Sequence, residues 1–219
     1  MSCSVLNPST KNIGDLKTYV RPYVPEVSLT IIEFNLRASL IEFARRTGVM
    51  HRVVEIHLQE GMTTYPIILD DCLQGVRIRS VCYGGHTSVF PKMTPPCCEC
   101  GGFTFYLDNP GCITIGREPS FTDECQLQKL RIHLEVAPTQ DTCNINEEVF
   151  NLWGETVAYG AMARILMIPN KAFSDKEASV MYDRKFKEGV KKARSDINAG
   201  YTRNGKATFG RAIVFRGRR

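Results

Sequence analysis

Cysteines gather in one short stretch, and they are the side chains in this sequence best suited to metal chemistry. The run Cys97-Cys98-Glu99-Cys100-Gly101 contains a C-x-x-C-G pattern, which places two thiolates for tetrahedral zinc. Cys112 or Cys125 could add further ligands. A second C-x-x-C or H-x-x-H pair is missing, so we expect free thiols, with Cys97, Cys100 and Cys112 as weak alternative zinc ligands.

The other reactive side chains form no catalytic pattern. The nine cysteines are irregularly spaced, which argues against a disulfide framework and for reduced thiols that pack as small hydrophobic side chains. The histidines, at positions 51, 57, 86 and 133, lack metal-binding spacing, and no phosphate-binding glycine motif occurs. We therefore predict no enzyme activity, no catalytic residue and no cofactor. A thiol enzyme, in which one cysteine is far more reactive than its neighbours, is an alternative hypothesis.

Charge is distributed unevenly along the chain. The stretch from Asn170 to Arg219 has 14 basic and 5 acidic residues, a local net charge of +9, whereas the rest of the chain has a net charge of −4. The last segment, 200–219, has six basic residues and no acidic one. A basic tail on an acidic body indicates an acidic partner, either a protein groove or nucleic acid. The lysine-rich helix expected after Asp175 is more simply a solvated face.

The chain of 219 residues has the composition of a globular protein, with 43% hydrophobic and 23% charged residues. This length allows one large domain or two small ones. No apolar run is long enough to cross a membrane, and residues 1–15 lack the pattern of a signal peptide. We expect a soluble protein that is made in the cytosol.

Periodicity predicts helices at both ends of the chain and strands between them. Residues 1–27 are polar and contain three prolines, so we expect an extended arm. A helix capped by Thr30 and Glu33 should run to Gly48. Two further helices are expected, one from Asn146 to Pro169 and one after Ser174 or Asp175. Strands are expected at residues 54–58, 64–69, 76–83, 103–107, 112–115 and 130–136.

These elements predict an α+β protein: a three-helix bundle with an antiparallel β unit inserted between its first and second helices, an extended N-terminal arm and a basic C-terminal tail. The predicted boundaries are 1–27 for the arm, 28–50 plus 146–199 for the bundle, 51–145 for the inserted β domain and 200–219 for the tail. The first helix must pack against the last two, because a single amphipathic helix cannot bury its apolar face alone.

Two blocks of residues carry a family resemblance. The first consists of Val24-Pro25-Glu26-Val27, Asn35-Leu36-Arg37-Ala38, Phe43-Ala44-Arg45-Arg46-Thr47-Gly48-Val49 and Thr64-Tyr65-Pro66. The second consists of Trp153, Ala158, Ala163-Arg164-Ile165-Leu166, Pro169, Ala178, Tyr182, Phe186, Gly189 and Lys192-Ala193-Arg194. In these blocks the chain resembles the phage head-to-tail adaptor (connector) proteins, in particular the tail tubular protein A type of short-tailed phages.

The resemblance implies a structural protein of the virion neck, made in the host cytoplasm. Such proteins form a ring, usually dodecameric, below the portal and carry the tail on its other side. Their partners are the portal protein, the tail tube or nozzle protein and further copies of the same chain; genomic DNA passes through the lumen as cargo, and no membrane is involved. Their C-terminal segments commonly reach into grooves of the portal.

The basic tail suits such docking, because isolated aromatic side chains among arginines are typical interface hot spots. The expected portal-docking residues are Phe209, Arg211, Ile213, Phe215, Arg216, Arg218 and Arg219. The main alternative is a nucleic-acid-binding protein that uses the basic C-terminal third, with or without a zinc knuckle, and binds with steep salt dependence. For the cysteine run, a disulfide formed late, in the released virion, is a further alternative.

Overall fold

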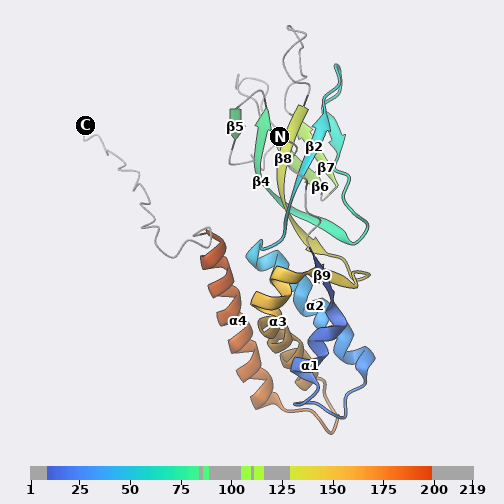
Figure 1. Ribbon diagram of the computed structural model, residues 1–219, viewed down its shortest axis with the longest axis vertical. Helices are drawn as coiled ribbons and strands as arrows, with labels where there is room; N and C mark the ends of the chain where they lie inside the picture. Colours follow the sequence, from blue (N-terminus) through green and yellow to red (C-terminus); the bar gives the residue numbers. More distant parts are fainter. Residues whose placement is uncertain (1–8, 84–85, 89–104, 110, 116–128, 199–219) are drawn as a thin grey trace, which may run out of the picture.

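The computed structural model describes residues 9–83, 86–88, 105–109, 111–115 and 129–198. In this part the chain is a mixed α and β protein with antiparallel sheets, which is compatible with the predicted α+β class. The helices lie at one end of the molecule and the larger sheets at the other (Figure 1). The tail at 200–219 and the cysteine run at 97–100 fall outside the described residues.

The predicted extended arm is wrong for much of its length. Strand β1 (Thr10–Asn12) is followed by a short 3-10 helix, η1 (Ile13–Leu16), and by helix α1 (Lys17–Val20). Ile13, Leu16 and Val20 are almost fully buried. Their spacing of three and four residues places them on one helical face, and burying that face outweighs the extended preference of the nearby prolines.

Helix α2 (Leu29–Thr47) closely matches the first predicted helix. Its N-cap is Ser28 rather than Thr30: the Ser28 hydroxyl accepts from the Ile31 N–H at 3.5 Å. Its C-terminal end at Gly48 is confirmed. Gly48 has φ +67°, the left-handed conformation that glycine adopts without strain, and its N–H donates to the Ala44 carbonyl at 2.9 Å.

The strands form three antiparallel sheets. Their bounds are β2 (His51–His57), β3 (Thr64–Pro66), β4 (Leu73–Tyr83), β5 (His86–Ser88), β6 (Phe105–Asn109), β7 (Cys112–Ile115), β8 (Lys129–Pro138) and β9 (Asn144–Asn146). The strand orders are β2-β8-β4-β5, β3-β7-β6 and β1-β9. Each of the six predicted strands is present. The sequence pattern missed β1, β5 and β9, which have three residues each and so show no alternation.

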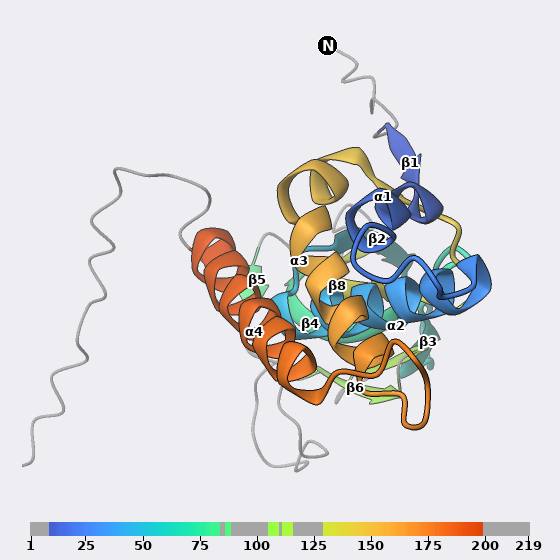
Figure 2. The ribbon, with the colours of Figure 1, turned by 90° about the horizontal axis from the view of Figure 1, so that it is seen from below.

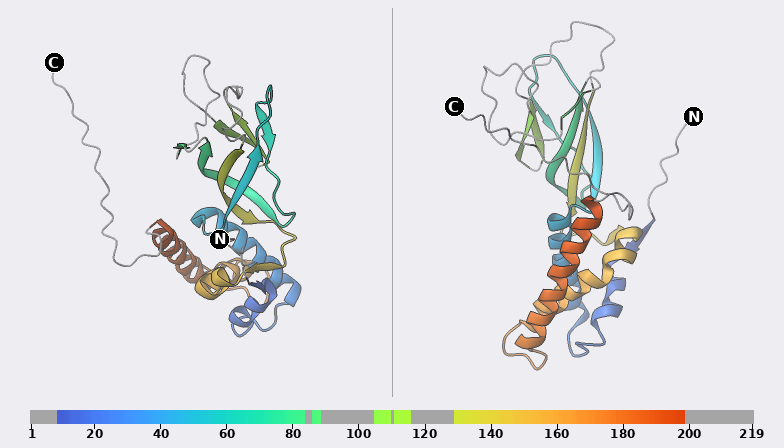
Figure 3. Two further views of the ribbon diagram at one scale, coloured as in Figure 1. Left: turned by 45° about the horizontal axis from the view of Figure 1, so that its top comes forward. Right: turned by 90° about the vertical axis from the view of Figure 1, so that its left-hand side faces the viewer.

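Helix α3 (Glu147–Leu166) begins after the N-cap Asn146, as predicted, and α4 (Lys176–Asn198) begins after Asp175. Helix α3 contacts both α2 and α4, and the three long helices lie side by side in Figure 2 and Figure 3. Two buried hydroxyls join them: Ser39 of α2 donates to the Val157 carbonyl and Ser179 of α4 donates to the Ala163 carbonyl, both at 2.7 Å. Helix α3 is thus hydrogen-bonded to both neighbours.

Candidate docking surfaces

The outer face of helix α4 is strongly basic. Its inner face buries Tyr182, Phe186 and Val190. The exposed basic residues of this helix are Lys176, Arg184, Lys185, Lys187, Lys191, Lys192 and Arg194. Lys187 pairs with Asp183 at 2.5 Å, and within the described chain no ion pair engages the other six. This face offers positive charge to an acidic partner.

A cluster of aromatic side chains packs against the same helix. The rings of Tyr159 and Tyr182 stack at 5.9 Å between centroids, and the Lys185 ammonium lies 5.1 Å and 5.6 Å from those two centroids. Tyr159 donates a hydrogen bond to the Glu155 carboxylate, which raises the pKa of Tyr159 to about 12. Burial raises the pKa of Tyr182 in the same direction. Both phenols therefore stay protonated to a higher pH than tyrosines with the ordinary pKa of 10.

Large apolar side chains are exposed on α1 and on the N-terminal half of α2. Phe34 is 60% exposed, and Ile31 lies one helical turn before it. A second exposed group, Met167 and Val180, flanks a groove of about 310 Å³ between α3 and α4. Exposed apolar side chains clustered among polar ones are typical of protein–protein contact surfaces.

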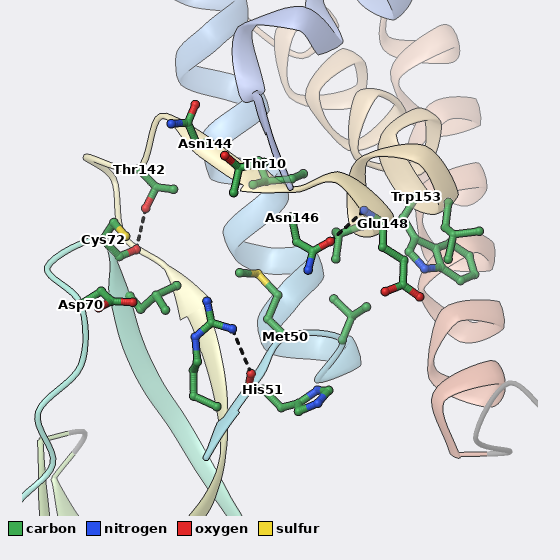
Figure 4. A pocket seen from close by; sticks show the side chains of 16 residues that line it. Thr10, Met50, His51, Asp70, Cys72, Thr142, Asn144, Asn146, Glu148 and Trp153 are labelled. Carbon is green, nitrogen blue, oxygen red and sulfur yellow. Dashed lines mark hydrogen bonds between the residues drawn. The ribbon is translucent and has the colours of Figure 1, made fainter. Parts of the chain in front are cut away.

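A deeper cleft of about 560 Å³ lies where the helices meet the β sheets (Figure 4). It is lined by Thr10, Val49, Met50, His51, Arg52, Asp70, Cys72, Leu73, Thr142, Asn144, Ile145, Asn146, Glu148, Val149, Leu152 and Trp153. Hydrogen bonds stabilise two segments of the rim. The Thr142 hydroxyl donates to the Cys72 carbonyl at 2.6 Å, and the Asn146 side chain accepts from the Glu148 N–H at 2.8 Å. These bonds hold the backbone at two places on the rim of the cleft.

Trp153 is the unusual member of this lining. It is only 6% exposed, and its indole N–H has no hydrogen-bond partner within the described chain. In Figure 4 the indole nitrogen lies on the side of the ring toward Glu148. A buried donor left without an acceptor costs about 1–3 kcal/mol, so this N–H favours any acceptor that can reach it.

A buried carboxylate connects the two ends of the molecule. The Glu135 side chain, on β8, is 5% exposed and forms ion pairs with Arg77 and Arg79 of β4, the latter at 3.2 Å. Its carboxyl carbon would lie 2.6 Å from a Cβ placed on Gly48. Glycine at this helix end is therefore required both by the backbone conformation and by the carboxylate that packs over it.

Few of the predicted site residues lie in the described part of the chain. The expected docking residues, from Phe209 to Arg219, and the candidate zinc ligands Cys97 and Cys100 fall outside it. Cys112 is partly buried on β7. Within the described residues, no cluster of three metal-ligating side chains occurs, and no helix is both long and apolar enough to cross a membrane.

Sequence reasoning missed the cleft and the buried ion pair. Cleft residues come from four separate stretches of sequence, and Trp153 has the sequence pattern of an ordinary core residue on the apolar face of its helix. Glu135 follows the alternating pattern of a strand, in which a solvated carboxylate is the usual interpretation. No local signal could have revealed either feature.

We compared the chain with protein-family models and with curated proteins, and neither comparison gives a match.

Proposed function

We propose that this chain is the subunit of a phage head-to-tail adaptor ring, which binds below the portal, carries the tail on its other side and forms part of the channel for the genome. In this proposal the scaffold is a three-helix bundle of α2, α3 and α4, with the β domain inserted between its first and second helices. The partners would be the portal protein, the tail tube or nozzle protein and further copies of this chain, which by analogy with the resembling family would form a dodecamer.

The observation that carries this proposal is the position of the residues that resemble the family. Six of them, Val27, Leu36, Phe43, Trp153, Tyr182 and Phe186, are buried in one contiguous hydrophobic core. They come from both blocks, and most of the β domain separates the two blocks in sequence. These six apolar residues therefore lie in one packed unit, as expected for a shared scaffold.

Two surface features fit a ring subunit. Exposed apolar residues such as Phe34 and Val180 are suited to contacts between neighbouring copies. The basic face of α4 leads directly into the segment 200–219, which carries the proposed docking residues. A ring would present many copies of this segment to the portal at once, so individually weak contacts would add up to stable attachment.

The proposal is tested by removing residues 200–219 and measuring association with the portal ring of the phage that encodes the chain. We expect the truncated chain to keep its helical circular dichroism and to lose portal attachment in size-exclusion chromatography with light scattering. Replacing Phe209 and Phe215 with alanine should weaken attachment about tenfold or more, because buried aromatic residues dominate such interfaces. The matched control R203K/K206R, in the same segment, should attach normally.

The alternative function, nucleic-acid binding, is favoured by the exposed basic residues of α4. It predicts that the isolated chain binds duplex DNA with an affinity that falls steeply as salt rises. Portal attachment that is unaffected by the truncation would contradict the docking role of the tail. Salt-dependent DNA binding without any portal association would contradict the adaptor proposal as a whole.

A further inference from the structure

The cleft between the helices and the sheets has a natural occupant in the chain itself. We propose that residues 1–8 of the same chain bind in this cleft, with a backbone carbonyl of the segment accepting the indole N–H of Trp153. The inference does not depend on the adaptor function. It rests on the unpartnered N–H, on where the segment leaves the described structure and on its composition.

The segment starts at the rim of the cleft. Thr10 is one of the lining residues, and β1 is fixed to the start of α3 beside it. The Ser9 carbonyl accepts from the Glu147 N–H at 2.9 Å, and the Lys11 ammonium lies 3.1 Å from the Glu147 carboxylate. Eight residues extend up to about 27 Å, so the segment can reach every wall of the cleft. This tether gives it a high effective concentration there.

The composition of the segment matches the lining. Its sequence, Met1-Ser2-Cys3-Ser4-Val5-Leu6-Asn7-Pro8, has no charged side chain. The apolar pair at positions 5 and 6 suits the apolar wall, which includes Val49, Met50, Val149 and Leu152. Leu152 is 54% exposed without an occupant, and covering it would remove apolar surface from water.

Access to the indole depends on Glu148. This exposed side chain lines the same wall as Trp153, and its carboxylate forms no ion pair within the described chain. Nothing therefore holds it beside the indole, and a change of its rotamer makes room for an incoming carbonyl. The new hydrogen bond would satisfy a donor that is otherwise buried without a partner.

The proposed path predicts which cysteines meet. Figure 4 shows Cys72 and Trp153 on opposite sides of the cleft, with Thr10 between them. A segment that enters beside Glu148 and crosses toward Asp70 brings Cys3 close to Cys72, which is exposed and free. Cys143 is also exposed and free but does not line the cleft, so it serves as an internal control for random collisions.

The test is disulfide trapping in the full chain, followed by peptide mapping. Mild oxidation with diamide removes two electrons and two protons from a pair of thiols and transfers them to the reagent, which forms the disulfide. We expect the yield of the Cys3–Cys72 disulfide to be about tenfold higher than the yield of Cys3–Cys143. Binding of the segment in the cleft raises the effective concentration of Cys3 beside Cys72 only. Equal yields of the two bonds would overturn the proposal.

Two variants with the same added charge distinguish loss of binding in the cleft from an effect of the added charge itself. V5D/L6D should reduce the Cys3–Cys72 yield about tenfold, since aspartates cannot bury in the apolar wall, whereas S2D/S4D should leave it close to the wild-type value. Unchanged trapping in V5D/L6D would also overturn the proposal. Circular dichroism checks that both variants remain folded.

Trp153 supplies a second readout, because it is the single tryptophan of the chain. In a ¹⁵N-tryptophan-labelled sample its indole N–H gives one NMR signal. We expect that signal to shift upfield when residues 2–8 are deleted, as the hydrogen bond is lost. An identical signal in the full and shortened chains would contradict the proposed acceptor.

A mixture of the C3S and C72S chains tests whether the occupant is a second copy instead. In this mixture a Cys3–Cys72 bond can form only between two chains. We expect no such bond, because the segment is seated in its own chain. A Cys3–Cys72 dimer on a non-reducing gel would overturn the intramolecular assignment and identify the neighbouring copy as the donor.

Discussion

The helical part and the β part of the molecule build their cores from differently arranged stretches of chain. The helical core combines residues from four stretches, 13–27, 32–43, 145–166 and 182–193. The core of the β part lies entirely between Ile56 and Val136. The β part is therefore local in sequence, whereas the helical part is complete only when both ends of the chain have come together.

The two parts also differ in their buried polar links. In the helical part, the buried hydroxyls of Ser39 and Ser179 donate to backbone carbonyls of α3, and the ion pair between Arg164 and Glu42, at 2.6 Å, is partly exposed. In the β part, ion pairs join neighbouring strands: Arg131 with Glu55 at 2.7 Å, and Arg77 with Glu135. The hydrogen bonds between closely packed helices leave no room for a larger side chain. The ion pairs between strands depend on charge. Substitutions that change volume and substitutions that change charge should therefore affect the two parts differently.

The largest effect is expected at Gly160, where α3 packs against both α2 and α4. A Cβ at this position would clash with the Ser39 hydroxyl and lie 2.8 Å from a ring carbon of Phe186. G160A should lower the free energy of unfolding by about 3 kcal/mol, since overfilling a packed core forces the helices apart. Thermal unfolding followed by circular dichroism should show a midpoint roughly 6–12 °C lower.

A double-mutant cycle with S39A identifies the cause of this loss. S39A removes the hydroxyl that the new methyl group meets, so G160A should cost less in the S39A background than in the wild type. If the losses of unfolding free energy in S39A and G160A simply add in the double mutant, the clash with Ser39 does not limit the contact between α2 and α3. The helical part would then not be more sensitive to added volume than the β part.

A smaller effect is expected from the buried carboxylate of the β part. E135A should lower the free energy of unfolding by about 2 kcal/mol, because it removes the shared partner of Arg77 and Arg79 while leaving both arginines about half exposed to water. Urea unfolding at low and high salt measures the loss.

E55A is the matched control, because Glu55 pairs with Arg131 on the same sheet but is exposed. Its destabilisation should be smaller than that of E135A and should fade at high salt, as expected for a solvated pair. Equal losses in the two variants would mean that burial of Glu135, beside Gly48, adds nothing to the link between the two parts.

Much of this fold could be predicted from the sequence, because its longer elements carry clear periodicity. The alternation of Val54, Ile56 and Leu58 indicated β2, and Gly48 marked the end of α2. The N-terminal segment was misjudged because its three prolines outweighed the spacing of Ile13, Leu16 and Val20. Short runs of helix stabilised by tertiary burial lack a strong local signal.

The candidate surfaces were less predictable, because they depend on which distant segments meet. The basic face of α4 could be predicted, since lysines and arginines alternate with Tyr182 and Phe186 at helical spacing. The cleft could not, because Thr10, Cys72 and Trp153 are neighbours only after folding. Exposure of Phe34 was equally hidden, since an aromatic residue in an amphipathic helix is ordinarily assigned to the core.

The smallest effect concerns pH and sharpens the comparison within the helical part. The hydrogen bond to Glu155 raises the pKa of Tyr159 to about 12, above the ordinary value of 10. The unfolded chain therefore loses this proton first, so the contribution of Tyr159 to stability is complete below pH 10 and is lost as the pH rises toward 12. E155Q removes the carboxylate that accepts the hydrogen bond from the phenol and should lower the pKa of Tyr159.

The measurement is the absorbance of tyrosinate during a titration with base. Subtracting the curve of Y159F from that of the wild type isolates the titration of Tyr159 among the eight tyrosines. Subtracting the curve of E155Q/Y159F from that of E155Q gives the titration of Tyr159 without the Glu155 carboxylate. A pKa that is the same in both backgrounds would show that Glu155 does not hold the phenol, and would leave the packing of Tyr159 against Tyr182 and Lys185 as the main feature of this face of α4.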